Sequence, residues 1–269
     1  MQHNGGMSES QAVPAVELPG DVSMPMVGFG TWKVTGGQVE PAVAAALATG
    51  YRHIDTATMY GNEAEIGAAL AASDLARADI FLTTKLRPGD VGHEPDVLRR
   101  SLRALRTDYV DLWLVHWPPR TARGRAAVWN GFRELRDQGL VKAIGVSNFS
   151  LDQIDQLIEA TGEAPAVNQV RWSPSYYDPD VLVGHKARGI ALEGYSALKD
   201  RRLKDPALAQ IAAAHQVTVA QVILRWHLEH GVTVIPKSVH PDRIAANFDL
   251  LRFSLTEAEV ARIDGFGNL

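Results

Sequence analysis

The chain has 269 residues, of which 46% are hydrophobic and 22% are charged, an ordinary globular composition that argues against long disordered tails. Lysine and arginine number 27 against 31 aspartate and glutamate, so the formal net charge of -4 gives no electrostatic basis for binding nucleic acid or an anionic membrane. The sequence contains no cysteine, which excludes disulfides, thiol nucleophiles and cysteine-ligated metals. Neither a membrane-length apolar run of roughly 20 residues nor a secretory signal is recognisable. We therefore expect a cytoplasmic protein with no membrane and no nucleic-acid partner.

The predicted elements begin with a hairpin, because residues 16–18 and 22–24 flank the turn-forming Pro19-Gly20-Asp21. Residues 1–15 are expected to be a flexible segment. After the hairpin, short apolar β-rich runs alternate with amphipathic stretches of helical period. The expected strands are residues 26–30, 53–57, 80–86, 110–117, 143–148, 166–172, 190–196 and 232–238. The expected helices are residues 41–49, 63–73, 96–106, 125–138, 152–160, 179–187, 219–229 and 242–251, and a ninth that Thr256 caps.

Eight strand–helix units with near-continuous apolar strands predict an α/β protein whose parallel sheet is covered by helices. Eight repeats over about 250 residues close naturally into a (β/α)8 TIM barrel, with the hairpin covering the bottom of the barrel. We expect residues 16–269 to form this single domain. The alternative is a doubly wound open sheet, which usually carries a phosphate-binding glycine turn. Lys33 stands where the third glycine of that turn should follow Gly28 and Gly30, so the dinucleotide fingerprint is absent.

Polar side chains stand at the ends of three consecutive predicted strands and in one loop. Asp55, Lys85 and His116 end the strands, and Tyr60 lies in the loop that follows Asp55. In a barrel, the loops after the strands build the active site. A lysine at the end of an apolar strand needs a nearby carboxylate, and Asp55 on the neighbouring strand is the candidate.

Each of these four residues alone has an ordinary structural explanation, such as a packed histidine or a structural ion pair. Their coincidence at one end of the barrel favours a function. A tyrosine hydroxyl, with an ordinary pKa of about 10, becomes a usable acid near neutral pH where a cation stabilises its phenolate. Lys85 would supply that cation, Asp55 would hold it protonated, and His116 would donate a hydrogen bond to a substrate oxygen. This set polarises a carbonyl and protonates it, but a reduction also needs a hydride donor.

The motifs around these residues resemble those of the aldo-keto reductase family over essentially the whole chain. The bacterial members similar to 2,5-diketogluconate reductases are the nearest in appearance. The matching segments are Gly50-Tyr51-Arg52-His53-Ile54-Asp55-Thr56-Ala57, Tyr60-Gly61-Asn62-Glu63, Leu82-Thr83-Thr84-Lys85, Leu114-Val115-His116-Trp117-Pro118, Gly145-Val146-Ser147-Asn148-Phe149, Asn168-Gln169-Val170 and Ile235-Pro236-Lys237-Ser238, followed by Arg243 and Asn247.

The resemblance implies a monomeric barrel that binds NADPH across its mouth and reduces an aldehyde or ketone. It makes Tyr60 the general acid, with Lys85 and Asp55 tuning it and His116 orienting the carbonyl. Ser147, Asn148 and Gln169 would hold the nicotinamide carboxamide, and Tyr195 would stack on the ring. The full set of implied coenzyme contacts is Gly30, Thr31, Trp32, Ser147, Asn148, Gln169, Tyr195, Ser196, Leu198, Lys237, Ser238, Val239, Arg243 and Asn247.

Lys237, Ser238 and Arg243 form a second cluster around the end of the last predicted strand. Two cations and a hydroxyl suit a dianionic phosphate, such as the 2′-phosphate that separates NADPH from NADH. The alternative is a solvated basic face. Ala246 departs from relatives that often carry Glu or Gln against the adenine, whereas Asn247 remains.

Substrate contacts are expected from residues that follow strands at the same mouth. Aromatic and apolar walls suit flat or apolar carbonyls, and the candidates are Trp32, Met59, Trp117 and Trp172. Arg120, Arg123 and Arg125, in the loop after the fourth strand, either select acidic carbonyls or face water. The chain stops soon after its last helix, which predicts a wide, exposed site.

Two further functions compete with the reductase. A Schiff-base aldolase would use Lys85 as a nucleophile, but it needs a neutral amine, which Asp55 opposes. An NADPH-binding, redox-sensing interaction protein with little turnover would keep the coenzyme site. His227 and His230, three apart on a predicted helix, lack a third metal ligand, so we predict no metal site.

Overall fold

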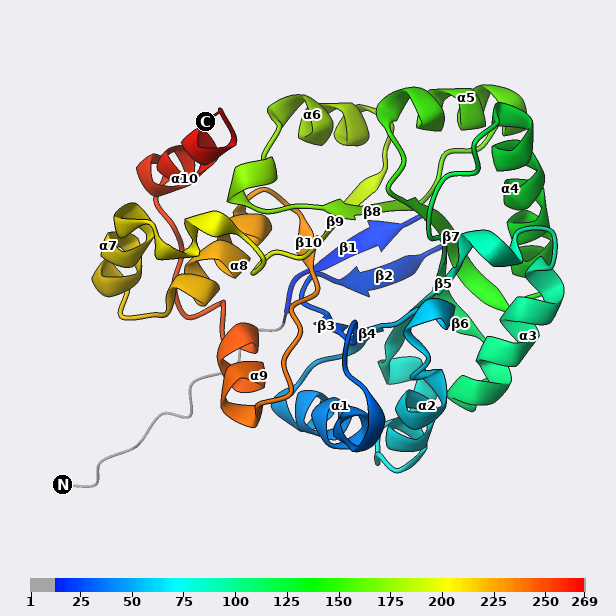
Figure 1. The fold of residues 1–269 in the computed structure, drawn as a ribbon, viewed down its shortest axis with the longest axis horizontal. Coiled ribbons are helices and arrows are strands. Elements are labelled where there is room, and N and C mark those ends of the chain that lie inside the picture. Colours follow the sequence, from blue (N-terminus) through cyan, green and yellow to red (C-terminus); the bar gives the residue numbers. More distant parts are fainter. Residues whose placement is uncertain (1–12, 269) are drawn as a thin grey trace.

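The computed structural model describes residues 13–268, and eight parallel strands in sequential order form its main sheet (Figure 1). Between the first and last strands, Val27 bridges in parallel to Val234, with the Gly28 N–H donating to the Val234 carbonyl at 2.8 Å. The sheet is therefore closed, and the predicted (β/α)8 barrel is confirmed. The strands are β3 (Phe29–Gly30), β4 (His53–Asp55), β5 (Phe81–Leu86), β6 (Val110–Val115), β7 (Val141–Ser147), β8 (Val167–Arg171), β9 (Ala191–Tyr195) and β10 (Thr233–Val234).

The predicted hairpin is present as the antiparallel pair β1 (Ala15–Leu18) and β2 (Val22–Pro25). Its buried Leu18, Val22 and Met24 pack with Phe81 and Val167, the first residues of β5 and β8. The hairpin thus covers the N-terminal end of the barrel and crosses the middle of the ring in Figure 1.

The structured part begins slightly earlier than the sequence indicates. Strand β1 starts at Ala15, and the Pro14 carbonyl accepts a hydrogen bond from the Met26 N–H at 2.8 Å. Of the segment expected to be flexible, Ala15 belongs to β1, and residues 1–12 lie outside the described part of the chain.

Helices follow the strands and surround the sheet (Figure 1). Thr256 and Glu259 form the capping box that starts the last helix, as predicted. Helix α7 was not predicted; Asp205 caps it and Pro206 occupies its first turn. The helices are α1 (Val39–Thr49), α2 (Glu63–Ala71), α3 (Glu94–Leu105), α4 (Ala122–Asp137), α5 (Leu151–Thr161), α6 (Pro179–Ala187), α7 (Pro206–Ala214), α8 (Val219–Glu229), α9 (Pro241–Phe248) and α10 (Glu257–Asp264).

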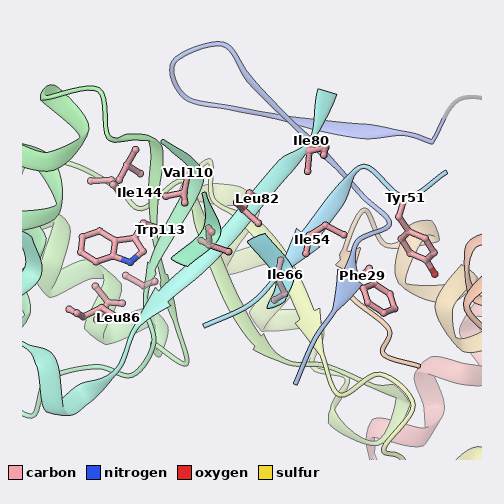
Figure 2. Packing of buried hydrophobic residues seen from close by; sticks show 14 of the residues in the cluster. Phe29, Tyr51, Ile54, Ile66, Ile80, Leu82, Leu86, Val110, Trp113 and Ile144 are labelled. Carbon is pink, nitrogen blue, oxygen red and sulfur yellow. The ribbon is translucent and has the colours of Figure 1, made fainter. Parts of the chain in front are cut away.

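Alternation along each strand separates two kinds of surroundings. Leu82 and Leu86 of β5 face the helices and belong to the main apolar cluster (Figure 2). In the same cluster, Trp113 stacks on Phe132 with ring centroids 3.8 Å apart. Phe81 and Lys85 have the opposite parity and point into the barrel. The interior is apolar beside the hairpin and polar near the C-terminal ends of the strands, and this gradient positions the site.

Within residues 13–268, no single helix is long and apolar enough to span a bilayer, although α7 and α8 meet the criteria together as a pair bent by 85°.

Candidate active site

An ion pair lies at the C-terminal end of the barrel interior. The Lys85 Nζ of β5 donates to both Asp55 carboxylate oxygens of β4, at 2.7 and 2.6 Å, and to the Thr56 carbonyl at 2.7 Å. The two side chains are at most 2% exposed. Burial lowers the pKa of Lys85, but the Asp55 carboxylate and nearby groups outweigh it and raise the pKa above its ordinary value. The carboxylate that the sequence argument required is therefore in place, and Lys85 is an ammonium.

Tyr60 lies beside this pair in the short 3-10 turn Thr58–Tyr60 that follows β4. Its hydroxyl is 3.5 Å from the Lys85 Nζ, and the ammonium lies 5.1 Å from the centre of its ring. Asn62 fixes the turn, because its amide donates to the carbonyls of Thr31 and Val34 at 3.0 Å each. The phenol is held between the ion pair and the loop that carries Trp32.

The sequence argument expected Lys85 to lower the pKa of Tyr60, and this direction is wrong. Burial raises the pKa of the phenol and outweighs the lowering by Lys85. The ammonium is already engaged by Asp55 and by the Thr56 carbonyl, and its 3.5 Å separation from the hydroxyl is long for a charge-assisted hydrogen bond. Tyr60 is thus firmly protonated, as a proton donor must be before reaction.

His116 follows β6 and faces Tyr60, with ring centroids 5.9 Å apart in an edge-to-face arrangement. Burial and the Lys85 charge lower its pKa to about 3, so the imidazole is neutral across the physiological range. A neutral imidazole carries one N–H, which lets His116 donate a hydrogen bond but not serve as a strong acid.

The remaining polar residues of the mouth are linked to one another. The Ser147 hydroxyl donates to the Gln169 carbonyl at 2.8 Å, and the Asn148 amide donates to Ser147 at 3.0 Å. The Tyr195 hydroxyl donates to the Asn148 side-chain oxygen at 2.8 Å. The Gln169 amide nitrogen reaches inward to Asp55 at 2.8 Å, which connects this group to the ion pair.

A pocket of about 440 Å³ joins these groups, in the size range of small-molecule sites. Gly30 forms one wall, where a Cβ atom would lie 2.6 Å from the Ile235 carbonyl oxygen, so a side chain is excluded there. Trp32, Met59 and Trp117 line the mouth and are 40 to 47% exposed. Its other lining residues are Lys33, Asp55, Tyr60, His116, Ser147, Asn148, Gln169, Tyr195, Ser196, Ala197, Leu198, Lys199, Ile235, Pro236 and Lys237.

The family model of the Aldo/keto reductase family matches residues 26–268. The chain belongs to the aldo/keto reductase family. It is 44% identical over 253 residues to an aldo-keto reductase of Mycolicibacterium smegmatis, covering 93% of this chain and 92% of that protein. A crystal structure of an aldo/keto reductase from Brucella melitensis superposes with a TM-score of 0.91 at 42% identity, covering 95% of this chain and 100% of that one. The Bombyx mori aldo-keto reductase in complex with NADP superposes with a TM-score of 0.88 at 32% identity, covering 96% and 94%.

These relatives make the chain an oxidoreductase of a family that uses nicotinamide coenzymes. They do not single out the 2,5-diketogluconate reductases, so that closer resemblance stays a prediction.

The structure corrects the substrate expectation for Trp172 and places one of the three loop arginines of this aldo/keto reductase in the interior. Trp172 is 1% exposed and packs against Trp226 of α8, because the parity of β8 turns it toward the helices. It therefore does not line the pocket. Arg125 is also buried and donates to the Pro119 carbonyl at 3.0 Å and to Gln156, whereas Arg120 and Arg123 are exposed and lie outside the pocket lining. The arginine loop gives no support to an acidic substrate.

The predicted phosphate cluster lies around the end of β10 and the start of α9. Lys237 lines the pocket, and Arg243 is exposed on α9. Ser238 accepts the His240 N–H at 3.1 Å in the turn before this helix. Among the predicted coenzyme contacts, those outside the pocket lining are Thr31, Ser238, Val239, Arg243 and Asn247.

The two histidines of α8 and its C-terminus have partners within the fold. His227 contacts the carbonyls of Ile223 and Trp172, and His230 contacts Asp264 at 2.8 Å. The described residues hold no group of three or more side chains suited to a metal.

The sequence analysis missed two polar residues that shape the site. Asp200 accepts hydrogen bonds from Ser173 and Ser175 and from the Arg202 N–H, at 2.6 to 2.8 Å, and so anchors the loop that carries Ser196 and Leu198. Glu193 lies inside the barrel and contacts Gln169. The alternation within predicted strand 190–196 already placed Glu193 on the same face as Tyr195, which was a usable signal.

Proposed function

We propose that this aldo/keto reductase reduces aldehydes and ketones to alcohols with NADPH, and that Tyr60 protonates the carbonyl oxygen. The observation that carries the proposal is the placement of the Tyr60 hydroxyl 3.5 Å from a lysine whose charge Asp55 stabilises, at the wall of a pocket. The NADP complex of the Bombyx mori relative supports the choice of coenzyme.

The residues of the pocket fit a nicotinamide coenzyme. Gly30 leaves room at the wall, and Ser147, Asn148 and Gln169 offer the donors and acceptors that a carboxamide needs. Tyr195 lies on the same pocket wall and supplies an aromatic face. Lys237 and Arg243 would hold the 2′-phosphate. The coenzyme, when bound, supplies the hydride.

The protein residues then handle the carbonyl oxygen. His116, neutral at physiological pH, donates a hydrogen bond to this oxygen, which sits between the imidazole and the phenol. Tyr60 transfers its hydroxyl proton to the oxygen as negative charge develops there. The phenolate that remains is stabilised by the Lys85 ammonium, and Asp55 keeps Lys85 protonated.

The test is the substitution Tyr60→Phe, which removes one oxygen and keeps the ring. We expect kcat/KM for a carbonyl substrate to fall by about 10²- to 10⁴-fold, the usual contribution of a general acid, while the Kd for NADPH measured by fluorescence stays within about twofold. Tyr176→Phe is the matched control, because Tyr176 is exposed and outside the pocket lining. Near-wild-type turnover in Tyr60→Phe would overturn the proposal.

The other functions predict different results. An aldolase would trap substrate on Lys85 with borohydride, but Lys85 is fully buried and protonated, which opposes that chemistry. A redox-sensing interaction protein would bind NADPH and turn over none of a panel of aldehydes, keto-acids and keto-sugars.

Three exposed side chains at the mouth support flat or apolar carbonyls as substrates. Trp32 and Trp117 offer aromatic faces, and Met59 offers an adaptable thioether. The small-molecule partner, the monomeric state and the cytoplasmic location stay predictions.

A further inference from the structure

A second carboxyl group lies inside the barrel, below the ion pair, and the proposed reaction does not use it. Glu193 of β9 is fully buried, and its register neighbours are Gln169 on β8 and Thr233 on β10. Its Oε2 accepts a hydrogen bond from the Gln169 Nε2 at 3.0 Å, and its Oε1 lies 3.7 Å from the His53 Nε2. Within the described residues, Oε1 has no hydrogen-bond partner.

The contacts of Gln169 determine how its amide is oriented. The amide nitrogen has two hydrogens, and both are used: one goes to the Asp55 Oδ2 at 2.8 Å and the other to Glu193. Two acceptors on different strands fix the plane of the amide as well as its direction. Since Gln169 also lines the pocket, its Oε1 is the end of the amide that is available to a bound molecule.

The charges around Glu193 leave it without a counter-ion. The nearby cation, Lys85, is committed to both oxygens of Asp55 and to the Thr56 carbonyl. His53 is neutral, because burial lowers its pKa to about 4, and it contacts the Pro25 carbonyl and the Thr83 hydroxyl. Burial, together with the Asp55 charge, raises the pKa of Glu193 to about 8. The raised pKa favours the uncharged acid near neutral pH, and Oε2 is the oxygen that accepts from Gln169.

We propose that Glu193 is a positioning residue for the coenzyme: as an acceptor it holds the second amide hydrogen of Gln169, so that the Gln169 Oε1 faces the carboxamide N–H of the nicotinamide. The inference rests on the proposed function, because it assigns a nicotinamide coenzyme to the pocket. Without Glu193, the amide keeps its contact with Asp55 and rotates about it, and the direction of Oε1 is lost.

The test compares two coenzymes that differ in the N–H group that Gln169 would accept. NADP⁺ carries a carboxamide, and its 3-acetylpyridine analogue keeps the carbonyl but has a methyl group in place of the NH₂. The ratio of their Kd values, from quenching of tryptophan fluorescence, measures the recognition of that N–H. Glu193→Leu removes the acceptor, whereas Glu193→Gln keeps an acceptor oxygen, the side-chain length and the neutral charge.

We expect Glu193→Gln to retain the wild-type ratio within about twofold. We expect Glu193→Leu to lower the preference for NADP⁺ by about five- to tenfold, the value of one hydrogen bond. An unchanged ratio in the leucine variant would overturn the inference, as would an equal loss in both variants, since the latter would mean that the acceptor oxygen is not what matters. A merely structural role would change both Kd values together and leave their ratio intact.

A second measurement does not depend on the leucine variant folding. In an infrared difference spectrum of wild type minus Glu193→Gln at pH 7, we expect the carbonyl stretch of a protonated carboxylic acid. Carboxylate bands in its place would overturn the neutral-acceptor assignment. If the wild-type protein bound neither dinucleotide, the proposed function itself would be wrong. If the wild-type protein bound NADP⁺ and reduced carbonyls with NADPH, but Glu193→Leu kept the wild-type Kd ratio, only this inference would be wrong.

Discussion

The two ends of the proposed coenzyme site are built differently. At the catalytic end, Asp55 and Lys85 are at most 2% exposed and joined by hydrogen bonds of 2.6 and 2.7 Å. At the other end, Lys237 and Arg243 are exposed on a loop and a helix, and neither forms an ion pair within the described part of the chain. Proton transfer needs fixed geometry, whereas a phosphate can be met by flexible cations. Substitutions at the first end should therefore affect folding and chemistry together, and those at the second should affect binding alone.

The largest effect is expected for Lys85→Met, which leaves the Asp55 carboxylate buried without a cation. We expect the free energy of unfolding to fall by about 3–5 kcal/mol and carbonyl reduction to be lost by orders of magnitude. Denaturant unfolding and kcat/KM measure the two effects. Lys186→Met, at an exposed position of α6, is the control and should change neither. A Lys85→Met protein as stable as wild type would show that the catalytic end is not a buried ion pair.

The phosphate end should respond in binding only. Lys237→Ala combined with Arg243→Ala is expected to raise the KM for NADPH by about 10²- to 10⁴-fold, because it removes two charge-assisted hydrogen bonds that are worth about 1.5–3 kcal/mol each. The KM for NADH, kcat at saturation and the melting temperature should change little. Arg99→Ala with Lys186→Ala removes two exposed cations elsewhere and serves as the control. Equal rises in KM for NADPH and NADH would show that Lys237 and Arg243 do not bind the 2′-phosphate.

The sequence was informative where chemistry and strand order suffice. A lysine at the end of an apolar strand requires a carboxylate on the neighbouring strand, and Asp55 supplies this carboxylate to Lys85. The sequence was less informative about properties that depend on packing. The pKa of Tyr60 is an example, because burial raises this pKa by more than the Lys85 charge lowers it. Trp172 could have been placed by parity, because Val170 and Trp172 share the helix-facing side of β8 while Gln169 faces the interior.

Glu193 illustrates what strand-by-strand analysis cannot supply. Its contact with Gln169 depends on the register between β8 and β9, and its protonation depends on Asp55 from the other side of the barrel. Helix α7, by contrast, could have been predicted from the sequence, because Asp205 followed by Pro206 is a recognisable helix start.

The pH dependence of the free energy of unfolding should reveal the buried Glu193 carboxyl group. The folded pKa of Glu193 is raised to about 8 from its ordinary value of 4.5, so the folded state holds a proton that the unfolded state releases. The resulting stabilisation is complete below about pH 4.5 and is lost as the pH rises toward 8, by up to about 1.4 kcal/mol per pH unit. The wild type should therefore lose stability relative to Glu193→Gln across this window. The buried His53, His116 and His227 destabilise both proteins equally in acid, so they cancel in the difference. A pH-independent difference would contradict the neutral Glu193.

The smallest effect is expected where the pocket meets solvent. Trp117 is 47% exposed, so Trp117→Ala removes a wall for an aromatic aldehyde without opening a core cavity. We expect the KM for such a substrate to rise several-fold, consistent with about 1 kcal/mol of lost aromatic contact, and the free energy of unfolding to change by less than about 1 kcal/mol. Trp172→Phe provides the converse, because Trp172 packs on Trp226 inside the helix layer. It should lower the melting temperature and leave the KM unchanged. If Trp172→Phe instead altered the KM while Trp117→Ala did not, the assignment of pocket wall and core between these two tryptophans would have to be exchanged.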